Sequence, residues 1–156
     1  IIPWIGDVVL SSPSGKQPLL AEGQVHVMPV SKGDFYELRN PYSEEAINFF
    51  QLRFAGNFSE AGEVFPIALE NHPNRLRPIY KNSHSLMIGS FDRRTEGIYI
   101  PDSPTHKLFI FAIEGAFEIQ NRLIQPRDGL ALWQVEEVEF EALSEGAVLM
   151  VVEMIE

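Results

Sequence analysis

The sequence contains no cysteine, which excludes disulfides, zinc ribbons, iron–sulfur clusters and thiol nucleophiles. It also lacks any apolar run near the ~18 residues that a membrane-spanning helix needs. No basic segment leads into the apolar core of a signal peptide. We therefore expect a cytoplasmic protein with no membrane association.

Basic residues are scarce, because 12 lysines and arginines face 22 acidic residues and the formal net charge is −10. A nucleic-acid-binding protein normally carries a basic footprint, so direct binding to DNA or RNA is not expected. Residues 71–94 are the exception, with five basic side chains against one acidic. This stretch is either a solvated connecting segment or a patch that docks an anion or a partner, formed by Arg75, Arg77, Arg93 and Arg94.

What the chain does have is alternation of apolar and polar residues with a period of two. Examples are residues 24–28, 48–54 and 135–143, while 107–113 and 147–152 are nearly continuous apolar runs typical of buried strands. Turn-forming dipeptides such as Glu114-Gly115 and Asp128-Gly129 separate these segments. The pattern predicts an all-β protein built as antiparallel sandwiches or barrels, with helical turns conceivable only at 43–46 and 59–69.

The strand pattern occurs twice, on either side of a polar stretch that contains proline. We interpret residues 1–70 as a first, partial β module, 71–78 as a linker and 79–156 as a complete second module with about eight strands. The first module opens on the apolar segment Ile1-Ile-Pro-Trp4, as though the chain began within a domain. A barrel that lacks its opening strands would expose apolar surface, which favours pairing with another copy in a homodimer over packing against the second barrel.

Few residues are arranged for chemistry. None of the four histidines forms an H-x-H, H-x-x-x-H or H-E-x-x-H pair, so no local pair can chelate a metal ion. His26 alternates with two valines and is either a lone ligand or base in a barrel or, as we favour, a satisfied or solvent-facing side chain. His72 fits a structural turn, and His84 and His106 fit a surface or a strand edge. The glutamates of 136–141 alternate with apolar residues, which indicates the solvated face of an edge strand.

The second module resembles the C-terminal cupin of bacterial pirin-like proteins, also called quercetinase-like bicupins. The resemblance rests on Ser85-Leu-Met-Ile-Gly-Ser-Phe-Asp92, Leu108-Phe-Ile-Phe-Ala-Ile-Glu-Gly-Ala-Phe-Glu-Ile119, Arg127-Asp-Gly-Leu-Ala-Leu-Trp133 and Val138-Glu-Phe-Glu-Ala-Leu143. It implies a jelly-roll barrel, and it implies that metal-ligand positions of cupins fall at Asp102, Pro104, Leu108 and Leu132 here, none of them a histidine.

The first module resembles the back part of the N-terminal cupin of the same family, through Glu22-Gly-Gln-Val-His-Val-Met28 and Val30-Ser-Lys-Gly-Asp-Phe-Tyr-Glu-Leu38. The resemblance implies that Tyr36 and Leu38 occupy the positions of a ligand histidine and a ligand glutamate. Family members with the full set bind non-haem iron through three histidines and a glutamate, and some oxygenate quercetin. We therefore expect no metal and no catalytic residue in this chain, although iron or another divalent metal is the family's cofactor.

Three functions follow as hypotheses. The preferred one is a pirin-like cupin without an intact metal site, which serves as a binding or regulatory module with a pocket lined by His26, Tyr36 and Leu38 and is not an enzyme. The alternative is a quercetin 2,3-dioxygenase-type oxygenase whose remaining ligands lie on an N-terminal segment outside the sequence. The third is a structural or partner-binding role through the basic stretch 75–94. The partners considered are a small-molecule ligand, in the pocket of the first hypothesis, and a protein partner. Independently of function, we expect these side chains in the core of the second barrel: Phe109, Phe111, Phe117, Leu130, Leu132, Phe140 and Val151.

Overall fold

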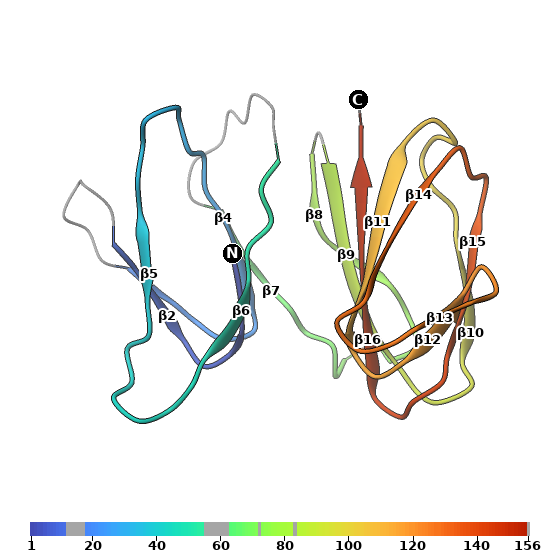
Figure 1. Ribbon diagram of the computed structural model, residues 1–156, viewed down its shortest axis with the longest axis horizontal. Coiled ribbons are helices and arrows are strands. Elements are labelled where there is room, and N and C mark those ends of the chain that lie inside the picture. The colour runs from blue at the N-terminus through green and yellow to red at the C-terminus, as the bar shows by residue number, and fades with distance from the viewer. Residues whose placement is uncertain (12–17, 55–62, 72, 83, 156) are drawn as a thin grey trace. The chain divides into compact units, whose positions relative to one another are not determined.

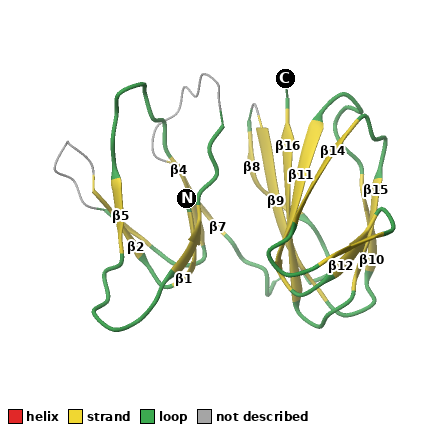
Figure 2. Ribbon diagram, viewed as in Figure 1, coloured by secondary structure: helices red, strands yellow, loops and turns green. Residues whose placement is uncertain are grey.

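The computed structural model describes residues 1–11, 18–54, 63–71, 73–82 and 84–155. Every regular element in these ranges is a β-strand, as Figure 2 shows, which confirms the predicted all-β class. The chain divides into two compact units, Ile1–Ile67 and Ala68–Glu156, and each is described by itself. None of the described residues forms a helix long and apolar enough to cross a membrane.

The first unit consists of short antiparallel pairings (Figure 1). Its strands are β1 (Ile2–Ile5), β2 (Val8–Ser11), β3 (Leu19–Leu20), β4 (Gln24–Val27), β5 (Glu37–Arg39), β6 (Asn48–Phe50) and β7 (Glu63–Pro66). β1 pairs with β6, β4 pairs with β7, and β2 lies between β3 and β5. The described side chains that are buried in this unit are Ile2, Pro3, Val8, Leu20 and Val25.

The helical turns that the sequence allowed are not found among the described residues. Residues 63–66 of the second candidate segment form strand β7, and 43–46 contain only a bend. The earlier part of that segment, 59–62, lies outside the described residues. Period-two alternation of Glu63, Val64, Phe65 and Pro66 fits the strand better than a helix.

The second unit is a jelly roll of two antiparallel sheets. Its strands are β8 (Arg77–Lys81), β9 (His84–Phe91), β10 (Glu96–Tyr99), β11 (Lys107–Glu114), β12 (Phe117–Ile119), β13 (Arg122–Ile124), β14 (Gly129–Trp133), β15 (Val138–Ala142) and β16 (Ala147–Met154). One sheet has the order β14-β11-β16-β9-β8 and the other β10-β15-β12-β13 (Figure 1). The residues that we placed in a linker therefore include Arg77 and Pro78, the first two residues of β8.

Two tight turns set the register of this barrel. Gly115 has φ +67°, and a Cβ there would come within 2.7 Å of the Ala147 methyl, so only glycine fits between β11 and β12. The second turn, predicted at Asp128-Gly129, is closed by two hydrogen bonds between Gln125 and Asp128. Asp128 N donates to Gln125 O over 2.9 Å, and Gln125 N donates to Asp128 Oδ2 over 3.0 Å.

The core of the second unit fills the space between its two sheets. Phe117, Phe140 and Val151 are buried in it as expected, and Leu130 and Leu132 pack against it half-buried. Phe109 and Phe111 were assigned to the wrong face of β11, since Leu108, Ile110 and Ala112 supply its core side chains. The two phenylalanines stack on each other on the opposite face, with ring centroids 6.1 Å apart.

The glutamate-bearing strand is not at an edge. β15 lies between β10 and β12, so Glu139 and Glu141 stand on the outer face of an interior strand. Their alternation with the buried Val138, Phe140 and Ala142 correctly indicated one solvated face, but the proposed protection of a sheet edge was wrong.

Candidate functional site

The three residues of the predicted pocket lie on different pairings of the first unit. His26 is in β4, opposite Val64 of β7. Leu38 is in β5, opposite Leu10 of β2, and Tyr36 directly precedes that strand. No hydrogen bond joins His26, Tyr36 and Leu38 to one another, so each is considered by its own surroundings.

Tyr36 is held by two side chains that sequence reasoning missed. Gln51 Nε2 donates a hydrogen bond to the Tyr36 hydroxyl, and Arg53 Nη2 donates a second over 3.2 Å. The guanidinium carbon of Arg53 also lies 5.8 Å from the centroid of the Tyr36 ring, within the range of a cation–π contact. The signal was present in the alternation of residues 48–54, which places Gln51 and Arg53 on the same side of the chain after β6.

His26 is half-buried, and one of its ring nitrogens is unsatisfied, contrary to our expectation of a satisfied side chain. Its Nε2 atom is buried and has no hydrogen-bond partner. Burial lowers the pKa of His26 below its ordinary value, because an imidazolium would be poorly solvated there. The ring is therefore neutral near pH 7, with one polar atom available to a ligand or a water molecule.

The metal that the cupin fold implies does not fit these residues. Among the described parts of the chain, no group of three or more His, Asp or Glu side chains is arranged to hold an ion. Leu38 is aliphatic, and the oxygen of Tyr36 already accepts from a cationic guanidinium, which would repel a metal ion. His26 is left as a single nitrogen donor, and one donor is too few for a centre of this type.

A different polar cluster lies inside the second barrel, around Glu153. This glutamate is 2% exposed and stands in the otherwise apolar strand β16. Its neighbour across the sheet is Leu108 of β11, and Leu108 in turn faces Leu132 of β14. The two leucines hold positions that the resemblance assigns to metal ligands, so Glu153 is the ionisable side chain of this row.

Three donors converge on the Glu153 carboxylate. The Tyr99 hydroxyl donates to Oε2, the backbone N–H of Asp102 donates to Oε1 over 2.8 Å, and His106 Nδ1 lies 2.5 Å from Oε1. A buried carboxylate needs such partners, because without them its desolvation would cost several kcal/mol. The cluster thereby fastens the connection between β10 and β11 to the end of β16.

The surroundings of Glu153 shift two further groups. Burial, together with the hydrogen bond to Glu153, raises the pKa of Tyr99 above its ordinary range. Lys81 Nζ forms an ion pair with Asp102 over 2.8 Å, which lowers the pKa of Asp102. His106 was expected at a surface or strand edge, yet it is largely buried against Glu153 with Nε2 directed away from that carboxylate.

His84, also expected at the surface or an edge, is buried at 9% exposure in β9 and lies opposite Met154 of β16. His72 lies outside the described residues. A histidine within a continuous strand run, such as His84 at the start of β9, gives no signal of its burial because both faces of that strand are covered.

The arginines of the predicted docking patch are divided by the fold. Arg77 is half-buried at the start of β8, whereas Arg75, Arg93 and Arg94 are exposed. Arg93 and Arg94 form the turn between β9 and β10, and Arg94 adopts a left-handed conformation with φ +67°.

Asn74 holds Arg75 next to this turn. Its side-chain amide donates to Asp92 Oδ2 over 2.8 Å, and its oxygen accepts from the Asp92 N–H over 2.7 Å and from the Thr95 hydroxyl over 3.0 Å. The Glu145 carboxylate accepts from the Arg93 N–H over 3.2 Å. We call the exposed set Arg75, Arg93 and Arg94 the arginine turn.

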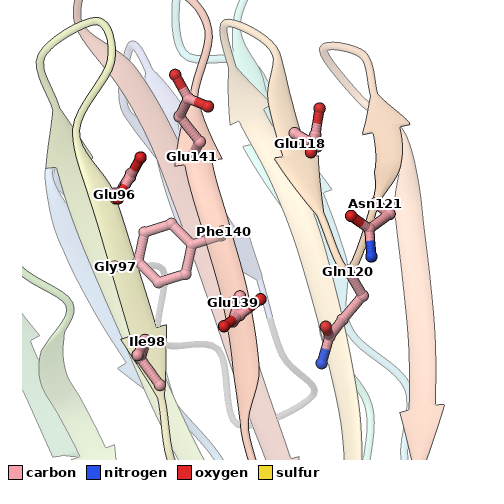
Figure 3. A pocket seen from close by; sticks show the side chains of 9 residues that line it. All are labelled: Glu96, Gly97, Ile98, Glu118, Gln120, Asn121, Glu139, Phe140 and Glu141. Atoms are coloured by element: carbon pink, nitrogen blue, oxygen red, sulfur yellow. The ribbon is translucent and has the colours of Figure 1, made fainter.

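A groove of about 630 Å³ lies on the outer face of the sheet β10-β15-β12-β13, shown in Figure 3. Its lining is dominated by glutamates that project outward from three neighbouring strands (Figure 3). The lining residues are Glu96, Gly97, Ile98, Glu118, Gln120, Asn121, Glu139, Phe140 and Glu141.

Comparison with known proteins agrees with this architecture. The family model described as the quercetinase C-terminal cupin domain matches residues 82–154. A search of curated proteins gave no match. Among solved structures, the nickel(II) complex of the bacterial pirin YhhW from Escherichia coli is similar over 98% of this chain and 70% of that chain, at 16% identity and a TM-score of 0.77.

Two further solved structures show the same fold. The protein YhaK from Escherichia coli matches 99% of this chain and 74% of its own, at 10% identity and a TM-score of 0.75. Quercetin 2,3-dioxygenase from Acinetobacter baumannii matches 98% of this chain and 63% of its own, at 17% identity and a TM-score of 0.72.

The two antiparallel sheets of the second unit and these fold matches identify its fold as that of a cupin. Residues 82–154 match the quercetinase C-terminal cupin domain, so the second unit carries a cupin domain of this type.

Proposed function

We propose that this pirin-like cupin is a binding or regulatory module that works without a metal centre of its own. The observation that carries the proposal is the pairing of Tyr36 with Arg53. At a position where the family resemblance places a ligand histidine, a phenol oxygen accepts a hydrogen bond from the positively charged Arg53 guanidinium. A cation would have to displace that guanidinium before it could use the same oxygen.

The second barrel supports the same proposal. Its interior row contains Leu108 and Leu132, and the Glu153 carboxylate next to Leu108 in this row is already bound by three protein donors. An oxygenase of the iron type instead needs imidazoles and a carboxylate that converge on one ion with open positions.

Metal analysis of the purified chain tests the proposal. We expect nickel(II) or iron(II) to bind substoichiometrically after dialysis, equally in the wild type, in His26→Gln and in the surface control Lys32→Gln. Stoichiometric metal in the wild type and the control that is lost in His26→Gln would overturn it.

The orphaned Nε2 of His26 favours a second candidate function. In that alternative the chain is an oxygenase of the quercetin 2,3-dioxygenase type, and His26 joins ligands that lie outside the described residues. Oxygen uptake with quercetin after loading with iron(II) or nickel(II), abolished in His26→Gln, would establish this candidate in place of the first.

A further inference from the structure

The outer face of the sheet β10-β15-β12-β13 carries a row of carboxylates in cross-strand register. Glu96 of β10 lies directly opposite Glu141 of β15, and Glu141 lies opposite Glu118 of β12. Directly opposed residues have Cβ atoms about 5 Å apart, and like charges at that spacing are destabilising. We call these three residues the glutamate row. The negative potential of this row favours contact with positively charged groups.

The same face also exposes large apolar side chains. Ile98 is 59% exposed and lies opposite Glu139, while Leu123 of β13 is 60% exposed and lies opposite Glu118. Apolar side chains ringed by charge are characteristic of protein–protein contact surfaces. The face therefore combines the two elements of a docking surface.

The arginine turn supplies the complementary charge at the edge of this face. Among the described residues, no carboxylate forms an ion pair with Arg75, Arg93 or Arg94. Arg94 N donates to Ala142 O over 2.7 Å, so the turn runs directly into the pairing of β10 with β15. Only Thr95 separates Arg94 from Glu96, the first member of the glutamate row.

We infer that a second copy of this chain docks on this face, with the arginine turn of each copy on the glutamate row of the other. Charge complementarity indicates a second copy as the partner, because the second unit carries both the arginine turn and the glutamate row. The closeness of the two patches on one unit suits a two-fold contact, in which each patch meets its counterpart and the assembly closes. This inference goes beyond the binding role proposed above and does not depend on it.

Sedimentation velocity over micromolar concentrations tests the inference with the full chain. We expect the wild type to sediment as twice the 17.7 kDa chain mass and to dissociate as salt is raised, since exposed charges are screened. The variant Arg93→Glu/Arg94→Glu and the variant Glu96→Arg/Glu118→Arg should each be monomeric, with unchanged circular dichroism. The reversal Lys32→Glu in the first unit serves as the control and should remain dimeric.

Mixing the two reversed variants gives the sharpest result. In a dimer of either variant alone, like charges would face each other. Arg93→Glu/Arg94→Glu has an acidic turn and an acidic row, and Glu96→Arg/Glu118→Arg has a basic turn and a basic row. A mixture of the two variants should therefore form a heterodimer. A wild type of 17.7 kDa at every concentration, or a dimer that persists in either reversed variant, would overturn the inference. Failure of the mixture to associate would overturn it as well.

Discussion

Glu153 is a single residue whose burial organises one end of the second barrel. It is 2% exposed, and it accepts from Tyr99, from the Asp102 N–H and from His106. Removing one member of such a group leaves the others buried without partners, which costs more than the hydrogen bonds themselves contribute. Its role is therefore to stabilise the connection between β10 and β11 whatever ligand the protein binds.

We expect Glu153→Leu to lower the free energy of unfolding by about 3–5 kcal/mol, the range for breaking a buried charged group's contacts. Glu153→Gln keeps an acceptor for the Asp102 N–H and should lose only about 1–3 kcal/mol. Urea unfolding followed by tryptophan fluorescence measures both. The exposed control Glu136→Gln should change by less than about 0.5 kcal/mol. A loss that small in Glu153→Leu would show that the carboxylate does not hold the cluster.

The two faces of β11 and its neighbours give a second prediction at this scale. Phe117 is 0% exposed between the sheets, whereas Phe111 is half-buried on the opposite face of its sheet. Phe117→Ala should therefore cost about 3–5 kcal/mol of unfolding free energy, and Phe111→Ala clearly less. Equal losses in the two variants, measured by chemical denaturation, would contradict the observed orientation of β11.

At the scale of elements, the class of fold could be predicted from the sequence because a strand with one solvated face alternates polar and apolar residues. In β15, Glu139 and Glu141 alternate with Val138 and Phe140, and the structure keeps that phase. In β11 both faces are apolar, so period two gives no phase and the larger phenylalanines were assigned to the core in place of Leu108 and Ile110.

The candidate site was much less predictable than the strands. Tyr36 could be singled out by resemblance, but its partners Gln51 and Arg53 come from a segment about fifteen residues away in the sequence, as the hydrogen bonds show. Glu153 could not be recognised as the centre of a polar cluster. A lone glutamate in an apolar strand indicates that it is buried, but it does not indicate which side chains bind to it. Such convergence is set by pairing between distant strands, which no local pattern encodes.

Strand β10 offers a prediction about packing between elements. Gly97 lies opposite Phe140 of β15, and a Cβ at Gly97 would overlap the Phe140 ring. Because Phe140 is buried at 6% exposure and cannot move away freely, Gly97→Ala should cost about 1–3 kcal/mol of unfolding free energy. The double variant Gly97→Ala/Phe140→Leu makes room for the methyl group, so its loss should fall below the sum of the two single losses. Additive losses in this double-mutant cycle would place the two residues out of contact.

At the scale of the whole molecule, charge is distributed by unit and by face. The glutamate row and the arginine turn both belong to the second unit, while the candidate pocket residues His26, Tyr36 and Leu38 belong to the first. The proposed ligand binding and the inferred self-association thus involve different parts of the chain. Charge reversal in the second unit can be tested without altering Tyr36 or Arg53.

The two units also respond to opposite ends of the pH range. Burial lowers the pKa of His26 from 6.5 in the first unit, and burial together with Glu153 raises the pKa of Tyr99 from 10.0 in the second. Below pH 6.5 the unfolded chain binds a proton that folded His26 resists, so stability should fall as the pH drops through this window. Above pH 10 the unfolded chain loses a proton that folded Tyr99 retains, so stability should fall as the pH rises.

Urea unfolding from about pH 5 to 11 measures the loss of stability at acid pH (the acid flank) and at alkaline pH (the alkaline flank). The two are separate because each depends on a different ordinary pKa. His26→Gln should flatten the acid flank and leave the alkaline flank unchanged, whereas Tyr99→Phe should flatten the alkaline flank alone. Each variant is the control for the other, since the two groups lie in different compact units. If Tyr99→Phe left the alkaline loss of stability intact, the Tyr99 proton would not be what the Glu153 cluster retains on folding, and another group would have to titrate in its place.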